Sequence, residues 1–120
     1  MVRALRGATT VENNDEQLIL DATAELLKLM VTANEINTKD IISVVFSITS
    51  DLNAAFPAAA ARQLGWTDIA LLDTAQADVP GSLERCIRVL MHFNTEKQND
   101  ELKYIYLKEA KKLRPDIISE

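Results

Sequence analysis

The 120-residue sequence predicts an α+β fold, in which a single mixed β-sheet carries one long helix and one or two short helices. Segments with alternating apolar residues, typical of strands, are separated by segments whose apolar residues recur every three or four positions, typical of helices. The chain has the length of one ordinary domain, and its 48% hydrophobic and 26% charged residues describe a globular protein. We therefore expect one domain over residues 1–120.

The first half of the chain contains two expected strands and two expected helices. A strand over residues 2–6 leads into a turn at Gly7, and a helix of about 18 residues follows the capping side chains at 13–15. Pro57 begins a short helix over 58–64, which Gly65 ends. Residues 41–49 are β-branched and alternate, which is typical of a strand. The expected buried faces are Leu18, Ala22, Leu26, Leu29, Met30 and Ala33 on the long helix, and Ile42, Val44, Phe46 and Ile48 on the second strand.

The second half of the chain is expected to be mostly strand. Residues 69–72 predict a short buried strand, residues 79–81 a turn, and residues 102–107 a last strand. A turn of helix within 95–100 and a short helix over 109–113, closed by Arg114 and Pro115, complete the chain. The order is β-α-β-α-β followed by two more strands. The fourth strand, over residues 86–94, places Ile87, Val89, Met91 and Phe93 on one face and Arg88, Leu90 and His92 on the other.

The composition excludes several classes of partner. Eighteen acidic residues against 13 basic residues argue against a nucleic-acid partner held through its phosphates. A single cysteine, Cys86, excludes an internal disulfide and fits a reducing compartment, and with one histidine it also excludes the common zinc ligand sets. No apolar run approaches the roughly 18 residues of a membrane span, and residues 1–7 are too short and charged for a signal peptide. We expect a cytoplasmic protein with no metal, nucleic acid or membrane partner.

Two arginines occupy unexpected places. Arg6 and Arg88 lie within predicted strands, at positions where a sheet usually carries apolar side chains. A buried guanidinium is costly unless an anion meets it. Each arginine is either the partner of a structural ion pair or a contact for an anionic ligand. Two of them in one small acidic protein favour the ligand.

Four segments, correctly ordered and spaced, resemble the small monofunctional chorismate mutases of the trimeric pseudo-α/β-barrel class. They are residues 6–10 (RGATT), 51–58 (DLNAAFPA), 79–89 (VPGSLERCIRV) and 106–116 (YLKEAKKLRPD). The resemblance covers residues 2–117. It implies a homotrimer whose sheets form a barrel-like core, with active sites between subunits.

The resemblance also implies a reaction, the [3,3] rearrangement of chorismate to prephenate on the route to phenylalanine and tyrosine. This pericyclic step involves no proton transfer and no covalent intermediate, and the family uses no cofactor. The protein must hold a flexible dianion in its reactive conformer and offset charge growing on the ether oxygen. Arginine suits both tasks, because it stays protonated and grips a carboxylate with two donors.

The resemblance assigns site residues by position. Arg88 matches the arginine beside the ether oxygen, Arg6 one that binds a substrate carboxylate, and Tyr106 a tyrosine that hydrogen-bonds the substrate. Without the resemblance Tyr106, Phe56, Leu71 and Leu72 would be assigned to the core, and Arg62 to an ordinary helix end. A tail over residues 108–120 is expected to close over the ligand. The other substrate-binding positions implied are Phe56, Ala58, Arg62, Leu71, Leu72, Asp73, Gln76, Leu113 and Arg114.

Three positions depart from the family pattern. Gln76 stands where the family has a glutamate, Asp73 where it has a cysteine, and Ala59 where a lysine is frequent. We hypothesise that Asp73 takes over as the carboxylate acceptor for the substrate hydroxyl, while Gln76 offers a neutral amide. Cys86 and His92 are expected to be structural.

Two alternatives to an active mutase remain open from the sequence. One is a non-enzymatic trimeric module that binds a small anionic metabolite, because arginines in a subunit cleft would serve binding equally well. The other is a degenerate mutase that folds and binds the substrate but turns it over slowly. This alternative stays open because Gln76 replaces the family glutamate.

Overall fold

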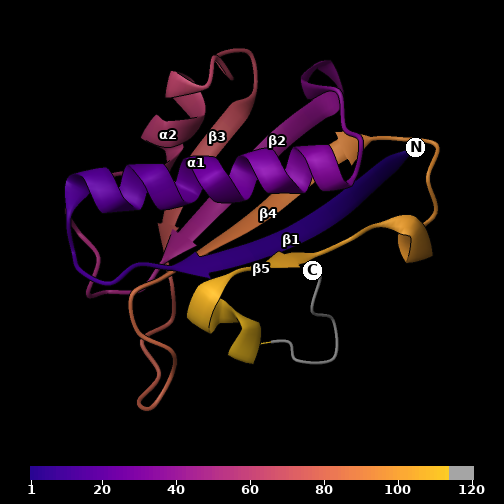
Figure 1. Cartoon of the computed structure of the whole chain (residues 1–120). Coiled ribbons are helices and arrows are strands. Elements are labelled where there is room, and N and C mark those ends of the chain that lie inside the picture. Colours follow the sequence, from indigo (N-terminus) through magenta and orange to yellow (C-terminus); the bar gives the residue numbers. More distant parts are fainter. Residues whose placement is uncertain (114–120) are drawn as a thin grey trace.

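The computed structural model describes residues 1–113 and contains a five-stranded sheet with the strand order β3-β2-β4-β1-β5. The central strand β4 runs antiparallel to both neighbours, whereas β3 is parallel to β2 and β5 is parallel to β1, so the sheet is mixed as predicted. Figure 1 shows helix α1 lying across this sheet. The strands are β1 (Val2–Thr10), β2 (Ile41–Ile48), β3 (Ala70–Ala75), β4 (Cys86–Asn94) and β5 (Ile105–Tyr106).

The helices begin and end where the sequence indicates. Asp15 caps α1, since its carboxylate accepts a hydrogen bond from the backbone N–H of Leu18. Gly65 follows α2 with a φ of +89°, the left-handed conformation that favours glycine after a helix. The order of elements is the predicted one. The α-helices are α1 (Glu16–Ala33) and α2 (Pro57–Gln63), and the 3₁₀ helices are η1 (Thr38–Asp40), η2 (Asn99–Glu101) and η3 (Lys108–Lys112).

The two faces of the sheet differ. Residues from both α-helices share one buried cluster with sheet residues such as Leu5, Val44 and Met91, so α1 and α2 cover the same face. The alternate residues point to the other face, which we call the open face. It carries half-buried or exposed side chains, namely Ala4, Arg6, Ser43, Val45, Leu72, Arg88, Leu90 and His92. Near η3 a smaller cluster, which includes Ala8, Cys86, Tyr106 and Ala110, buries part of this face.

The first strand is longer than predicted, because Gly7 does not make a turn. Strand β1 continues to Thr10. A Cβ on Gly7 would lie 2.6 Å from Met30 Sδ and 3.1 Å from a methyl carbon of Leu26. Glycine at this position therefore lets the sheet approach α1 closely, a role that the sequence does not distinguish from a turn.

Two predicted buried faces need correction. Leu18 and Leu29 are each 39% exposed, while Ile19 and Leu27 are fully buried, so the stripe of α1 is rotated relative to the prediction. In β2, a bulge between Ile41 and Ser43 breaks the alternation. As a result Ile42 faces solvent and Ile41 is buried.

The two edge strands also differ from their predictions. Strand β3 is longer than residues 69–72 and is not buried, since Leu72 is 61% exposed on the open face. Strand β5 is only two residues long instead of six. The backbone N–H and the carbonyl of Lys103 are both hydrogen-bonded to the Asn34 side chain. This part of the chain therefore does not pair with β1.

Within residues 1–113, no helix combines the length and the apolar composition needed to cross a membrane.

Candidate active site

A cavity of about 330 Å³ on the open face brings together four of the residues implied as site residues. Arg6 lies on β1 and Arg88 on β4, and the antiparallel register places Arg88 opposite Ala8, two residues beyond Arg6. Side chains two residues apart on a strand share a face, so both guanidinium groups belong to one side of the sheet. Tyr106 and Leu113 are the other two. The cavity is lined by Arg6, Gly7, Ala8, Arg88, Val89, Tyr106 and Leu113.

Neither arginine is neutralised by a carboxylate within the described part of the chain. Nε of Arg88 is buried and has no hydrogen-bond partner among residues 1–113. Arg3, on the same strand as Arg6, is different: its Nε donates to the Lys97 carbonyl (3.2 Å) and its Nη2 to the side chain of Gln98 (3.0 Å). A buried donor without a partner is costly, which argues that Arg88 is held ready for an anion from outside the chain.

Strand β5 and η3 form the wall of this cavity opposite β4. Tyr106 of β5 pairs with Ala8 of β1 and is buried, with 4% of its surface exposed. Lys108 has a φ of +54°, and the chain turns there into η3. The backbone N–H of Glu109 donates to Thr10 Oγ1 at 3.3 Å, which ties η3 to the end of β1. Leu113 thereby lines the cavity, whereas Arg114 lies outside the described residues.

The remaining predicted residues lie at the opposite edge of the sheet, on β3 and α2. Asp73 is opposite Phe46 in the register, so it points to the helix-covered face, and its Oδ1 accepts a hydrogen bond of 2.9 Å from the Ala58 backbone N–H. Leu71 packs against the main core from the same face. Leu72 points to the open face and does not share a surface with them. Phe56 has a large apolar side chain and is nevertheless 69% exposed. Arg62 is also exposed.

Gln76 follows β3 directly, and its backbone N–H donates to the Ile48 carbonyl at 2.9 Å. Its side-chain Oε1 is buried without a hydrogen-bond partner within residues 1–113. The carbonyl oxygen of this amide is therefore a second polar atom, after Arg88 Nε, that a ligand or a neighbouring chain could satisfy.

Cys86 and His92 do not line the cavity. Burial raises the pKa of the Cys86 thiol, with the nearby charge of Arg88 acting in the opposite direction, so the sulfur is a protonated thiol at neutral pH. His92 lies on the open face, where its Nδ1 is 3.3 Å from Ser43 Oγ, and it does not line the cavity. Among residues 1–113 no cluster of histidine, cysteine and acidic side chains could hold a metal ion.

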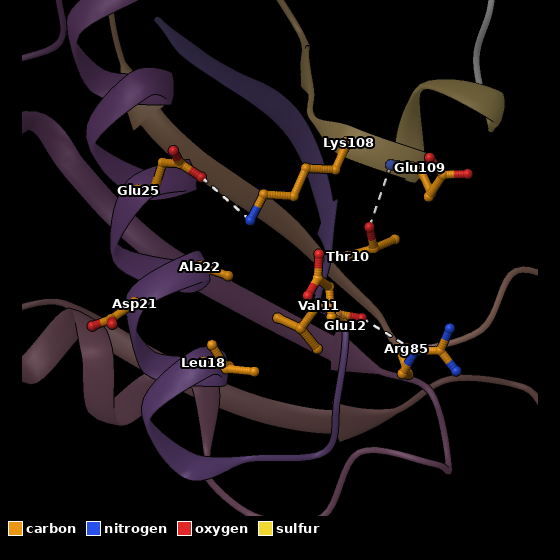
Figure 2. Close-up of a pocket in the computed structure, with 10 residues that line it drawn as sticks. All are labelled: Thr10, Val11, Glu12, Leu18, Asp21, Ala22, Glu25, Arg85, Lys108 and Glu109. Carbon is orange, nitrogen blue, oxygen red and sulfur yellow. Dashed lines mark hydrogen bonds and ion pairs between the residues drawn. The ribbon is translucent and has the colours of Figure 1, made fainter.

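A larger cavity, about 660 Å³, lies elsewhere, between α1, the end of β1 and the start of η3 (Figure 2). It contains none of the predicted site residues. Lys108 reaches Glu25 (3.8 Å), and Arg85 Nε donates to the Val11 carbonyl (3.2 Å), so its cations are already engaged. The pKa of the Glu109 carboxyl is lowered by its hydrogen bond with Lys112. An excess of carboxylates makes this cavity unsuitable for a dianion. Its lining residues are Thr10, Val11, Glu12, Leu18, Asp21, Ala22, Glu25, Arg85, Lys108 and Glu109.

Tyr104 is a further residue at the site that was not predicted from the sequence. The Arg6 Cζ atom lies over its ring, 5.6 Å from the ring centroid. The available signal was the spacing of Tyr104 and Tyr106, because residues two apart in a strand share a face.

Comparisons with known proteins show the family to which the chain belongs. The family model for chorismate mutase type I matches residues 2–117. The chorismate mutase AroH of Thermus thermophilus is 48% identical over 99% of this chain and 98% of its own length. That of Bacillus subtilis is 40% identical over 98% of this chain and 93% of its own length. A solved chorismate mutase from Clostridium thermocellum superposes with a TM-score of 0.90 at 52% identity, covering 91% of this chain and 97% of that chain. The chain belongs to the chorismate mutase type I family.

Proposed function

We propose that this protein is a cofactor-free isomerase that converts chorismate to prephenate, in a site that two copies of the chain build together. The observation that carries the proposal is the arginine cavity. It presents two guanidinium groups without a carboxylate partner in the described chain, one of them with a buried free donor. Family membership favours catalysis over the alternative of a non-enzymatic module that only binds an anion.

The residues of the cavity suit a reaction that moves electrons but no protons. Arg88 is placed to stabilise the charge that grows on the ether oxygen, while Arg6 holds a carboxylate of the dianion and Tyr106 donates a hydrogen bond. A rate gain of about 10⁶-fold requires about 8 kcal/mol. One preorganised donor at developing charge supplies roughly 3–4 kcal/mol, and holding the substrate in its reactive conformer can supply the rest.

A second copy is needed because the predicted residues divide between two edges of the sheet. The arginines lie on the open face near β5, whereas Asp73, Leu71 and Ala58 lie at the β3 edge on the helix-covered face. Strands β3 and β1 are three positions apart, roughly 14 Å by ordinary strand spacing. A dianion in the arginine cavity therefore meets the β3–α2 edge of a neighbouring chain. The family resemblance gives the number of copies as three.

Asp73 and Gln76 then contact the ring hydroxyl of the substrate from that neighbouring edge. One oxygen of Asp73 is used by Ala58, which leaves the second oxygen for the hydroxyl. The hydroxyl has one proton, and its hydrogen bond to Asp73 uses it, so the Gln76 amide donates through Nε2 to the hydroxyl oxygen. The buried Oε1 of Gln76 remains available to another donor. The apolar side chains of Phe56 and Leu71 form the wall beside the ring. Leu72, on the open face, instead packs within the assembly.

The C-terminal tail, residues 108–120, closes the site over the ligand. Ala110 within η3 is fully buried and Leu113 already lines the cavity, so the tail starts from a fixed position. Arg114 adds positive potential to an otherwise acidic protein. The unpaired, buried Cys86 fits a reducing compartment, and we assign the enzyme to the cytoplasm.

The direct test is to incubate the purified chain with chorismate and identify the product. Conversion to prephenate without added metal or cofactor supports the proposal, and a chain that binds chorismate without consuming it refutes it.

Assembly is tested separately. Light scattering should give about 40 kDa, three times the chain mass of 13.3 kDa. The variants Arg88→Ala and Phe56→Asp should each be inactive, but refolded together in equal amounts they should recover about a quarter of the parent activity, because each site draws one half from each of two chains. A mixture that stays inactive, with each variant separately of trimer mass, would contradict the shared site.

A further inference from the structure

The Arg6 side chain makes one described interaction, and it is with an aromatic ring. The Cζ atom of Arg6 lies 5.6 Å from the centroid of the Tyr104 ring, within the range of a cation–π contact. Within residues 1–113 the guanidinium makes no hydrogen bond and no ion pair. Its N–H donors are therefore free for a ligand while the group itself is held by the ring.

Tyr104 is itself held firmly in place on both sides. The residue before it, Lys103, donates its backbone N–H to Asn34 Oδ1 (2.7 Å) and accepts from Asn34 Nδ2 through its carbonyl (3.0 Å). The residue after it, Ile105, pairs with Gly7 of β1, directly beside Arg6. Tyr104 also packs against the main core.

Asn34 connects the segment that holds Tyr104 to the long helix α1. Its side chain is buried, with 1% exposed, and its Nδ2 also donates to the Met30 carbonyl in the last turn of α1 (2.9 Å). A buried amide with its hydrogen bonds satisfied has one orientation. The position of the Tyr104 ring is therefore determined by α1 and the core rather than by the two-residue strand β5.

We infer that Tyr104 is a positioning residue, which keeps the Arg6 guanidinium directed at the cavity before the substrate arrives. The inference rests on the proposed function and concerns the same site. An arginine side chain free in solvent loses much rotamer freedom when it binds a carboxylate, and this loss weakens binding. The ring restricts Arg6 in advance, so part of that loss is already taken in folding.

The effect should appear in substrate binding. Replacing Tyr104 by leucine removes the ring and is expected to raise KM for chorismate by about threefold to tenfold, the range of a partly exposed cation–π contact, with kcat little changed. Tyr104→Phe keeps the ring face and should restore the parent KM. Leu102→Ala is the matched control, since Leu102 packs against the same core two residues earlier, whereas the aromatic ring over which Arg6 lies belongs to Tyr104. It should lower stability without raising KM.

A double-mutant cycle separates positioning from a general structural role. In an Arg6→Ala background, Tyr104→Leu should cause no further rise in KM, because the ring then has no guanidinium to hold. An equal rise in both backgrounds, or a Tyr104→Phe variant as impaired as Tyr104→Leu, would overturn the inference.

A readout in the free protein keeps this test apart from the proposed function. The Nε–H resonance of Arg6 lies near the ring and should shift in Tyr104→Leu but not in Tyr104→Phe, whether or not the chain consumes chorismate. No shift in Tyr104→Leu would refute the contact. If the resonance shifts as expected in Tyr104→Leu but the parent protein does not convert chorismate, the proposed function is refuted and the contact between Arg6 and Tyr104 stands.

Discussion

One carboxylate oxygen of Asp73 accepts a 2.9 Å hydrogen bond from the backbone N–H of Ala58, so strand β3 caps helix α2. The helix receives no side-chain cap from its own N-cap residue, because that residue is Phe56, whose side chain has no hydrogen-bond acceptor. Asp73 thus joins the two elements that carry Phe56, Ala58, Leu71 and Gln76. A substitution at Asp73 is therefore expected to change both the stability of the protein and its turnover of the substrate.

Two substitutions separate these roles of Asp73. Asp73→Ala removes the cap and should lower the free energy of unfolding by about 1 kcal/mol, with a loss of turnover. Asp73→Asn retains an oxygen that can cap α2 but removes the negative charge, so stability should be kept while kcat falls. Urea denaturation and a chorismate assay measure the two effects. If Asp73→Ala turns over at the parent rate, the hypothesis that Asp73 replaces the family carboxylate is wrong.

Gln76 provides the comparison for Asp73. Gln76→Ala should impair turnover, because it removes the side-chain amide that we propose contacts the substrate. Gln76→Glu restores the family residue but puts a second carboxylate near Asp73, so we expect no gain. A rise of orders of magnitude in kcat/KM for Gln76→Glu would instead identify the parent as a degenerate mutase.

Arg88→Lys tests whether geometry or charge matters at the ether oxygen. Lysine keeps the positive charge but loses the planar fork of donors and the buried Nε, and we expect kcat to fall by about 10²- to 10³-fold. Steady-state kinetics and a denaturation curve, which should be close to that of the parent, give the comparison. Near-parental kcat would show that charge alone is sufficient.

The pH profile of turnover should be nearly flat from about pH 6 to 8. The arginines stay protonated throughout this range, and the mechanism transfers no proton. His92 does not line the cavity. A bell-shaped profile with a limb near the ordinary histidine value of about 6.5 would contradict the mechanism.

Cys86 should reduce stability at alkaline pH. Burial raises the pKa of its thiol above the ordinary value of 9.0, so the unfolded chain releases the proton at a lower pH than the folded chain. The stability present below pH 9 is then lost as the pH rises toward the folded pKa, by at most about 1.4 kcal/mol per pH unit. Urea denaturation at pH 7 and 10 should show a larger decrease for the parent than for Cys86→Ala, which lacks this titration. Equal decreases in the parent and in Cys86→Ala would mean that burial does not raise the pKa of the Cys86 thiol.

Gly7→Ala should destabilise the protein by about 1–3 kcal/mol. The added Cβ would meet Met30 Sδ at 2.6 Å, a Leu26 methyl at 3.1 Å and the Ile105 carbonyl oxygen at 3.2 Å, and not all of these can give way. Thermal unfolding measures the effect, and Ala4→Gly, on the open face of the same strand, tests whether any change in β1 would do the same. A Gly7→Ala protein of parental stability would mean that α1 shifts away freely.

Local patterns in the sequence determined most of the elements and their order. Asp15 as the cap of α1, Pro57 and Gly65 at the ends of α2, and the alternation of Ile87, Arg88 and Val89 depend on backbone geometry within a few residues, which the sequence displays directly. The resemblance to chorismate mutases came from motifs of the same kind, and the comparisons confirm it.

Tertiary structure alone decided which side of these elements is buried and which arginines are free. Ile42 is exposed because of a bulge, Gly7 is needed because α1 comes so close, and β5 is short because Asn34 binds Lys103 across 69 positions of sequence. Arg3 and Arg6 look alike in the sequence, yet within residues 1–113 Arg3 makes two hydrogen bonds, whereas the Arg6 guanidinium makes none and contacts only the Tyr104 ring. Such differences depend on contacts between residues distant in sequence, and a local pattern contains no information about them.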